Sequence, residues 1–312
     1  MMEFLVKVED KIYEISQLVS KVSYKDSINN GCSSLEFAYV NKDLDITNGS
    51  VVSFIYDSAP VFYGYVFKVS RDKGKEITVT AYDQLRYCKA KDIIVVYQDT
   101  VTTLVKRMCN YFHLKQGTIT DTKYTLTTEV KDDSTWLDII YSGVSDTLTN
   151  KGVWYVLRDE FGMVCVQDMA DLKLNLILGD KSLAYDYSYE KSIDEETYNQ
   201  IKIYAKAETS LEKQFVVVND KETVSTYGLL QYYEASDKLN SSTAKAKADV
   251  LLRLYNREAE TLTLSCLGDT RVRAGTSFYG KIEDIGYNKR LIVRSVTHNY
   301  LPIHTMEVEA ML

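Results

Sequence analysis

Proline and long apolar runs are scarce in this chain of 312 residues. Only two prolines occur, Pro60 and Pro302, so the sequence contains no proline-rich disordered linker. The N-terminal segment lacks the apolar core of a signal peptide, and no apolar run is long enough to cross a bilayer. These absences predict a protein that is made, and folds, in a cytoplasm.

The cysteines do not form the pattern of a disulfide framework or of a zinc site. They are odd in number, lie far apart, mostly among apolar neighbours, and no C-x-x-C motif occurs. Buried free thiols in a reducing compartment explain this usage better than disulfides do. The five positions are Cys32, Cys88, Cys109, Cys165 and Cys266.

Positive charge is not concentrated anywhere along the chain. The formal net charge is −7 and no long basic run exists, whereas a nucleic-acid-binding domain normally carries a basic face or stripe. The acidic balance therefore disfavours specific nucleic-acid recognition, and it suits the wall of a conduit through which a polyanion slides. Tyrosine is abundant instead, with 25 residues, which favours strands and protein interfaces.

Recognisable catalytic motifs are missing as well. There is no G-x-S-x-G elbow and no glycine-rich phosphate loop, although a Ser–His–Asp arrangement formed in space stays open. Two acidic clusters stand out, Asp132-Asp133 and Asp194-Glu195-Glu196. We interpret the first as helix capping and the second as a solvated loop. We therefore assign no catalytic residue, no cofactor and no cofactor-binding residue.

Only three histidines occur, namely His113, His298 and His304. His113 ends a predicted helix, where a cation is mildly favourable. If the last hairpin turns about Leu301, then His298 and His304 face each other across it. Such a pair could be half of a zinc site, but no third ligand is near in sequence, so a plain cross-strand pair is favoured and no metal ligand is assigned.

A short segment near the N-terminus is echoed at the C-terminus. Gly49 and Gly275 each open a strand, and Val66 and Val69 correspond to Val293 and Val296 at the same separation. After a turn, which is two residues longer in the second copy, a further alternating strand follows in each. Its apolar positions are Ile77, Val79 and Ala81 in one copy and Met306, Val308 and Ala310 in the other. Two copies of one β-module in a chain indicate assembly rather than catalysis.

The periodicity of the apolar residues divides the chain into three parts. Residues 1–95 read as strands, and residues 96–182 contain two amphipathic helices, near 101–112 and 137–150, with a hairpin at 154–166. Asp99 is the expected cap of the first helix, and Asp133 or Ser134 that of the second. A tyrosine-rich connector at 185–199, two strands and a third helix near 242–256 precede the closing strands.

We therefore expect a mainly β, α+β protein in which two tube-like β-barrel modules flank a small α/β insert domain. The predicted boundaries are 1–95 for the first module, 96–182 for the insert and 183–312 for the second module.

Several segments together resemble the XkdQ/YqbQ-type tail proteins of Gram-positive prophages and phage-tail-like bacteriocins. These proteins are similar in role to the baseplate hub, or late-control-gene-D, proteins of contractile tails. The resemblance runs nearly from end to end of the chain. The segments that carry it are 81–87, 152–162, 189–199, 227–233, 267–275, 296–298 and 304–307.

The resemblance implies a structural role in a phage tail or tail-like particle. Such hubs are homotrimers in which two tube-like modules per subunit form a pseudo-sixfold ring. One face continues the tail tube protein, and the other receives the threefold spike protein, beside other baseplate proteins. The resemblance brings no catalytic motif, so the chain is expected not to be an enzyme, and no membrane insertion by this chain is expected.

Two other classes of function stay open at this stage. The first is a tail-associated cell-wall hydrolase or glycan-binding module, in which the tyrosine-rich connector would form part of a sugar groove. The second, a nucleic-acid-binding factor, is disfavoured by the acidic balance.

Overall fold

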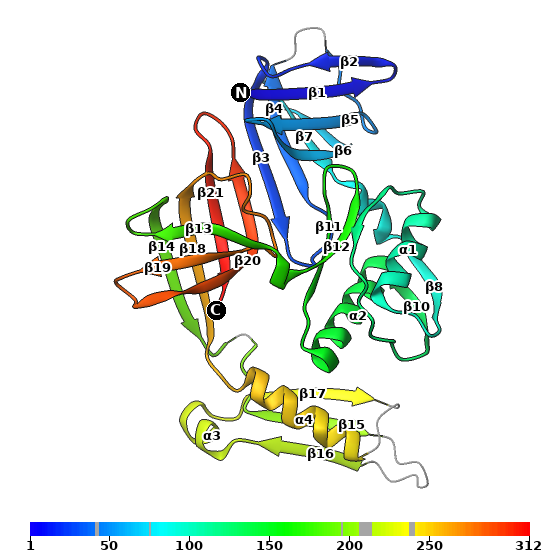
Figure 1. Cartoon of the computed structure of the whole chain (residues 1–312), viewed down its shortest axis with the longest axis vertical. Helices are drawn as coiled ribbons and strands as arrows, with labels where there is room; N and C mark the ends of the chain where they lie inside the picture. The colour runs from blue at the N-terminus through cyan, green and yellow to red at the C-terminus, as the bar shows by residue number, and fades with distance from the viewer. Residues whose placement is uncertain (41–43, 75, 195, 206–213, 237–240) are drawn as a thin grey trace. The chain divides into compact units, whose positions relative to one another are not determined.

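The computed structural model describes residues 1–40, 44–74, 76–194, 196–205, 214–236 and 241–312 (Figure 1). It forms two compact units. The first comprises Met1–Tyr187 and Thr263–Leu312, and the second comprises Ser188–Leu262.

Seven strands form what we call the first β-module. Their order in the sheet is β3-β4-β7-β6-β5-β1-β2, and all neighbours are antiparallel. Their inward residues build a core in which the rings of Phe4, Phe37 and Phe54 meet edge to face, with centroids 4.7 and 5.1 Å apart. The strands are β1 (Met2–Val8), β2 (Lys11–Glu14), β3 (Val19–Ser27), β4 (Ser34–Val40), β5 (Val51–Tyr56), β6 (Ala59–Arg71) and β7 (Glu76–Tyr82).

Six later strands form the second β-module, which continues the same thirteen-stranded sheet. The sheet runs β14-β18-β21-β20, and β19 pairs with β20 on one side and with β13, in parallel, on the other. β14 and β18 continue from the first compact unit into the second. The strands are β13 (Lys173–Gly179), β14 (Ala184–Ser192), β18 (Ala259–Leu267), β19 (Ser277–Ile282), β20 (Tyr287–Asn299) and β21 (Thr305–Met311).

The echo seen in the sequence is confirmed as a repeat of strand pairing. β5-β6-β7 and β19-β20-β21 are both antiparallel meanders. Val66 pairs with Ala81 as Val293 pairs with Ala310. Immediately after this pair each module has a β-bulge, at Phe67 in β6 and at Arg294 in β20.

The turns that lead into the two meanders repeat the same hydrogen bonds. Gly49 N–H donates to the carbonyl of Val66 over 2.8 Å, and Gly275 N–H donates to that of Val293 over 2.9 Å. Both glycines have a positive φ, of 89° and 84°, which residues other than glycine rarely adopt. The sequence signal at these two glycines therefore reflects a backbone conformation that both modules need.

The correspondence extends to the two strands that complete each sheet. Val40 N–H at the end of β4 donates to Leu18 O beside β3, over 3.1 Å. Leu267 N–H at the end of β18 donates in the same way to Leu183 O beside β14, over 2.9 Å. Hence β4 corresponds to β18, and β3, with nine residues, corresponds to β14, also with nine.

Between the two modules the chain folds as an insert with its own core. Two helices cover short strands, and their apolar faces pack together with the central hairpin. The predicted helices and hairpin are present. The elements are η1 (Gln84–Lys89), β8 (Lys91–Val96), α1 (Val101–Tyr111), β9 (Gln116–Ile119), β10 (Glu129–Thr135), α2 (Trp136–Lys151), β11 (Tyr155–Asp159), β12 (Val164–Asp168) and η2 (Met169–Asp171).

Both predicted helix caps are wrong by one or two residues. Thr100 rather than Asp99 caps α1, and Thr135 rather than Asp133 or Ser134 caps α2; each threonine makes a capping box with the residue three positions later. Asp133 instead lies beside a bulge in β10 with φ of 53°. The capping interpretation of Asp132-Asp133 is therefore also wrong.

The second compact unit is a three-stranded sheet covered by a helix. Ile201 and Ile203 of the central strand are buried against Ala244 and Ala248 of the helix, which confirms the predicted third helix and its apolar face. Residues 185–192 of the tyrosine-rich segment lie in strand β14, so the interpretation of this part as a connector is wrong. The elements are β15 (Gln200–Ala205), β16 (Gln214–Asn219), α3 (Lys221–Tyr227), β17 (Gln231–Ser236) and α4 (Ser241–Tyr255).

The class of the fold is confirmed as mainly β, α+β, with a large and mostly antiparallel sheet. In the described part of the chain this sheet is open and does not close into a barrel. None of the described helices combines the length and the apolar character that crossing a bilayer requires.

Candidate functional site: the junction of the two β-modules

The two β-modules are joined strand to strand by β3 and β20. Ser27 lies opposite Ser295 and Ser23 opposite Asn299 in an antiparallel register. Ile28 N–H donates to Arg294 O, and beyond the paired residues Tyr300 N–H donates to Val22 O, each over 2.9 Å. The junction therefore makes one continuous sheet from two repeated halves.

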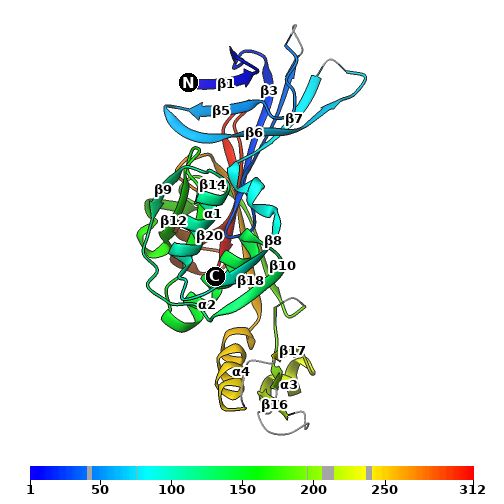
Figure 2. The same cartoon turned by 90° about the vertical axis from the view of Figure 1, so that its right-hand side faces the viewer.

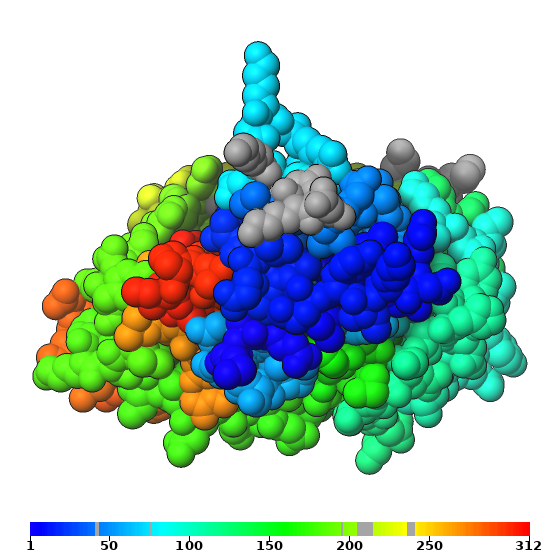
Figure 3. Space-filling model, turned by 90° about the horizontal axis from the view of Figure 1, so that it is seen from above, coloured from blue at the N-terminus to red at the C-terminus, as the bar shows by residue number. Residues whose placement is uncertain are grey.

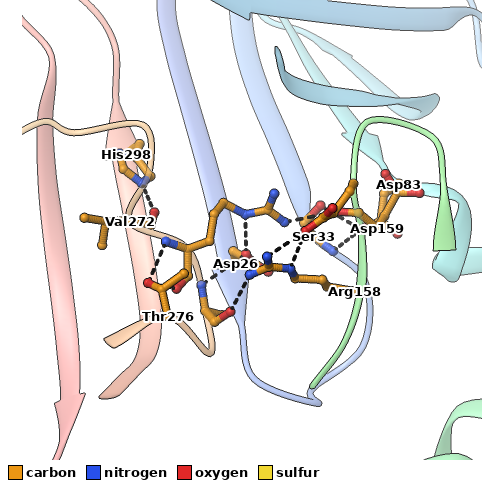
Figure 4. A network of polar contacts seen from close by, with 11 residues as sticks. Asp26, Ser33, Asp83, Arg158, Asp159, Val272, Thr276 and His298 are labelled. Atoms are coloured by element: carbon orange, nitrogen blue, oxygen red, sulfur yellow. Dashed lines mark hydrogen bonds and ion pairs between the residues drawn. The ribbon is translucent and has the colours of Figure 1, made fainter. Parts of the chain in front are cut away.

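A buried ion pair lies at this junction (Figure 4). Arg273, in the turn that leads into β19, donates from Nε to Asp26 Oδ2 of β3 over 2.6 Å. The two side chains are only 15% and 6% exposed. Burial by itself lowers the pKa of Arg273, but Asp26, Tyr24 and Glu160 together raise it above the ordinary value. The guanidinium is therefore held charged inside the junction.

The α/β insert is attached to the same place. Arg273 Nη2 donates to the carbonyl of Asp159 over 3.2 Å. Arg158 donates from Nη1 to Ala274 O over 3.3 Å, and its Nε and Nη2 donate to Glu160. Two adjacent insert residues thus bond to the turn that opens the second module.

The loop after β3 also holds the insert. Asn29 donates from Nδ2 to Tyr155 O and accepts at Oδ1 from Leu157 N–H, both over 3.0 Å. Its side-chain amide thus satisfies backbone groups of β11 as a neighbouring strand would. Tyr141 of α2 bonds through its hydroxyl to both backbone groups of Gly31 in the same loop.

Two buried carboxyl groups complete the network. Asp83 accepts hydrogen bonds at Oδ2 from the backbone and hydroxyl of Ser33, both over 2.7 Å. Asp159 accepts from Gln84 Nε2 over 2.8 Å and from Gly162 N–H over 2.7 Å. Burial raises the pKa of both aspartates, and the charge of Asp159 raises that of Asp83 further, while these hydrogen bonds oppose the shift.

His298 and His304 lie close to each other in the last hairpin, where His298 of β20 pairs with Tyr24 of β3. Asn299 pairs with Thr305, so the hairpin is centred on Pro302 rather than Leu301, and the two histidines are not directly opposite. Their rings nevertheless approach, with His298 Nδ1 and His304 Nε2 3.0 Å apart.

The hydrogen bonds define the state of the His298 ring. His298 Nε2 lies 2.8 Å from Val272 O, a pure acceptor, so Nε2 carries the proton and Nδ1 accepts from His304. Burial lowers the pKa of His298 to about 4, and burial also lowers the pKa of His304. Among the described residues no three His, Cys, Asp or Glu side chains gather as metal ligands.

The other sequence candidates lie apart from the junction. His113 follows α1 and its C-cap residue Phe112, Asp133 pairs with Lys91 at the surface, and Glu195 of the second acidic cluster lies outside the described residues. The prediction of free thiols is confirmed: Cys88, Cys109, Cys165 and Cys266 are buried, and Cys32 is half-buried. Burial raises the pKa of the Cys109 and Cys165 thiols to about 11, so neither thiol is an activated nucleophile.

Sequence reasoning missed the Arg273–Asp26 pair. The two residues are far apart in the sequence and belong to different modules, so no local pattern connects them. The repeat does give a partial signal, because Arg273 stands in the second module where Thr47 stands in the first. Ser50 N–H donates to Thr47 O as Thr276 N–H donates to Arg273 O. A charged residue at a repeated turn position is the feature that could have identified it.

Solved structures that superpose on this chain include a prophage tail protein and a type VI secretion component. The 43 kDa tail protein of prophage MuSo2 from Shewanella oneidensis superposes with a TM-score of 0.75 at 14% identity, over 99% of this chain and 98% of that chain. The E. coli c3393 protein, described as a type VI secretion component similar to T4 tail proteins gp27 and gp5, gives a TM-score of 0.58. That match has 10% identity and covers 94% of this chain and 73% of that chain. The fold is thus that of phage-type tail proteins.

The chain belongs to the YQBQ-like family, whose model matches residues 22–311. It is 26% identical over 270 residues to the uncharacterized protein YqbQ of Bacillus subtilis (strain 168), covering 85% of this chain and 81% of that protein. It is also 26% identical over 286 residues to the phage-like element PBSX protein XkdQ of the same organism, covering 88% and 87%. The resemblance predicted from the sequence is confirmed.

Proposed function

We propose that this chain is a structural protein of a phage tail or phage-tail-like particle, and that it acts as the baseplate hub. In this role a homotrimeric ring adapts the sixfold tail tube to the threefold spike. The repeat is the observation that carries the proposal. Because each chain holds two β-modules with the same strand pairing, three chains present six similar modules.

The relatives support the tail assignment. XkdQ is named as a protein of a phage-like element, and the solved protein from Shewanella oneidensis is a prophage tail protein. The c3393 protein is described as similar to two T4 tail proteins. We propose the same setting here, with the tail tube protein, the spike protein and other baseplate proteins as partners.

We assign the ring modules to residues 1–95 and 183–312 and the insert to 96–182, except that η1 and β8 are counted with the insert, whose core they share, and β13 with the second module, whose strand β19 it pairs with. In this arrangement the buried Arg273–Asp26 pair and the β3–β20 pairing fix the angle between the two modules of one chain. A fixed angle is what a ring of defined size requires. The proposed mechanism is mechanical, and no residue of the chain is given a catalytic role.

The particle mass tests this proposal. The purified chain, alone and mixed with candidate tail tube and spike proteins, is measured by light scattering after size exclusion and by negative-stain imaging. We expect a threefold mass and rings. A chain that stays monomeric under all of these conditions, with neither partner retained, contradicts the hub.

One observation favours a second candidate, a glycan-binding module. A surface hollow of about 470 Å³ combines aromatic and carboxylate side chains, as sugar-binding grooves often do. Its tyrosines are Tyr185, which is 64% exposed, and Tyr187, whose hydroxyl donates to Asp284 over 3.1 Å. Further lining residues are Asp180, Ala184, Asp186, Leu264, Ile282 and Glu283.

Binding to purified cell wall distinguishes this candidate. Sedimentation with peptidoglycan and with wall polysaccharide is compared between the native chain and Tyr185→Ala. Retention that the substitution abolishes supports a glycan groove. Equal sedimentation of the two proteins, or none, contradicts it.

A further inference from the structure

Among the strands that the structure describes, two edges have no partner strand where the repeat is incomplete. In the described part of the chain β14 is the terminal strand at one end of the large sheet. On the side of β6 that faces β5, Val66 is the last residue with backbone hydrogen bonds. It accepts from Gly49 N–H and donates to Ser50 O. No described strand pairs with that side beyond Val66, although β7 continues along the other side to Arg71. The end of this hairpin projects from the first module (Figures 2 and 3).

In the second module, the strand edge that corresponds to this open edge of β6 already has a partner strand. Val66 corresponds to Val293, so residues 68–72 correspond to residues 295–299. Residues 295–299 of β20 pair with β3 of the first module. Since β3 corresponds to β14, the chain itself contains the kind of junction that its two open edges would make with each other.

We propose that β6 of one copy pairs antiparallel with β14 of a second copy, in the register that β20 adopts with β3. The inference rests on the proposed function, because ring assembly is what brings the copies together. The register places Lys68 opposite Ser192, Ser70 opposite Glu190 and Asp72 opposite Ser188. The partner is thus another molecule of this chain.

The backbone of β6 is arranged for this pairing. In the intrachain junction, Arg294 O accepts from Ile28 and Tyr300 N–H donates to Val22, so alternate residues of β20 face β3. By correspondence, the backbone groups of Phe67, Val69 and Arg71 face away from β7. A strand from another copy satisfies these groups and removes an edge that would otherwise promote aggregation.

One pair of side chains on the two edges is complementary in charge. Lys68 on β6 is exposed and basic, and Glu190 on β14 is exposed and acidic. In the proposed register Lys68 lies diagonally from Glu190 on one face.

The interface is head-to-tail, because each copy contributes two different edges. Such an interface closes into a ring when the rotation between copies divides a full turn, and otherwise it propagates as an open filament. The intrachain β3–β20 junction would then alternate with the interchain β14–β6 junction around the ring. Three copies would make six strand junctions of one kind.

A disulfide tests the register directly. Lys25 and Thr297, the intrachain counterparts of Glu190 and Ser70, lie opposite each other between hydrogen-bonded pairs. Such positions have Cα atoms about 4.5 Å apart, within the range of a disulfide. One chain carrying Ser70→Cys and Glu190→Cys is oxidised, and its products are separated under denaturing, non-reducing conditions.

Two matched variants serve as controls. Lys25→Cys with Thr297→Cys is expected to form a disulfide within one chain, which verifies the reference geometry. Ser70→Cys with Lys191→Cys places the thiols on opposite faces of the paired strands, so it is expected to form none. Four of the five native cysteines are buried and therefore contribute little background.

Each outcome separates the two proposals. A covalent trimer from Ser70→Cys with Glu190→Cys, absent from the mismatched control, supports both. Covalent ladders beyond three copies support the strand pairing and contradict the trimeric hub. A native trimer that forms no interchain disulfide, while the intrachain control forms, overturns the strand pairing and leaves the hub standing.

Hydrogen exchange of the unmodified chain gives a second measurement that does not depend on the variants. Amide exchange in peptides covering 67–72 and 186–193 is compared between dilute and assembled protein. We expect slower exchange of both segments on assembly. Unchanged exchange in an assembled particle contradicts the pairing.

Discussion

Through one side chain, Arg273 makes three contacts with strand β3 and with the insert. Its guanidinium bonds to Asp26 in β3 and to the backbone of Asp159 in the insert, and it lies over the Tyr24 ring at 5.2 Å. A buried charge that loses its partner is costly, whereas a buried pair replaced as a whole often is not. The residue therefore matters for the stability of the first unit.

Replacing Arg273 with alanine is expected to lower the free energy of unfolding of the first unit by about 3–5 kcal/mol, because Asp26 is left buried and unpaired. Urea titration followed by tryptophan fluorescence measures this, since Trp136 and Trp154 both lie in that unit. Arg271→Ala is the control. It removes an ion pair with Asp269 in which Arg271 is 59% and Asp269 14% exposed, and because solvent reaches this pair it should cost less than Arg273→Ala. Equal losses in the two variants would contradict the assigned role.

His298 is expected to make stability depend on pH. Its folded pKa of about 4 lies below the ordinary value of 6.5, so the unfolded chain binds more protons between these values. The contribution of His298 is therefore fully present above pH 6.5 and is lost as the pH falls towards 4, by about 3 kcal/mol in total. His298→Gln, whose amide can still donate to Val272 O, should not show this component. Urea titrations of both proteins are made in parallel from pH 7 to 4. If the free energy of unfolding changes equally with pH in the two proteins, this contribution of His298 is excluded.

At the scale of elements, the strands of the repeat were predictable because their buried positions alternate and their turns need glycine. β14 was not, because its residues are mostly polar or tyrosine and only some are half-buried. Its strand character depends on pairing with β18, which the local sequence does not encode. The helix caps were misplaced for a related reason: several candidate side chains precede each helix, and the capping geometry selects among them.

Thr135→Ala tests the observed cap of α2. Thr135 Oγ1 accepts from Asp138 N–H over 3.1 Å, and Asp138 accepts in return from the Thr135 backbone and hydroxyl. Loss of this cap is expected to lower stability by about 1 kcal/mol. Ser134→Ala, at a predicted cap position that the structure does not use, is expected to change stability by less than half as much. If urea titration shows a larger loss of stability for Ser134→Ala than for Thr135→Ala, the cap predicted from the sequence would be the correct one.

At the scale of the whole molecule, neither composition nor periodicity revealed that Ser188–Leu262 forms a compact unit of its own. The helix within it was predictable from its apolar face. That the unit interrupts a repeated module became apparent only when β14 and β18 were matched to β3 and β4. Long-range correspondence of this kind is set by sheet topology, which a single sequence shows only where the repeat retains similar residues.

The chain enters and leaves the second unit at neighbouring points. Lys191 lies 3.3 Å from Glu260, and Tyr198 N–H donates to Tyr255 O over 3.1 Å. Replacing residues 194–257 with a short Gly/Ser linker is therefore expected to leave the first unit folded, with its tryptophan-detected unfolding midpoint unchanged within error. Loss of a cooperative transition in that variant would show that the first unit depends on the second.

The loop after β3 and the whole segment between β14 and β18 occupy the same position in the repeat. In the first module the loop at this position forms hydrogen bonds to the insert through Asn29 and Gly31. In the second module the segment at this position forms most of a separate compact unit. If the modules arose by duplication of one gene segment, their common ancestor had a loop whose length was free to vary without disturbing any strand pair. Lineages of this family should therefore differ most in length at residues 28–33 and 193–258, and acquire new segments there before anywhere else in the sheet.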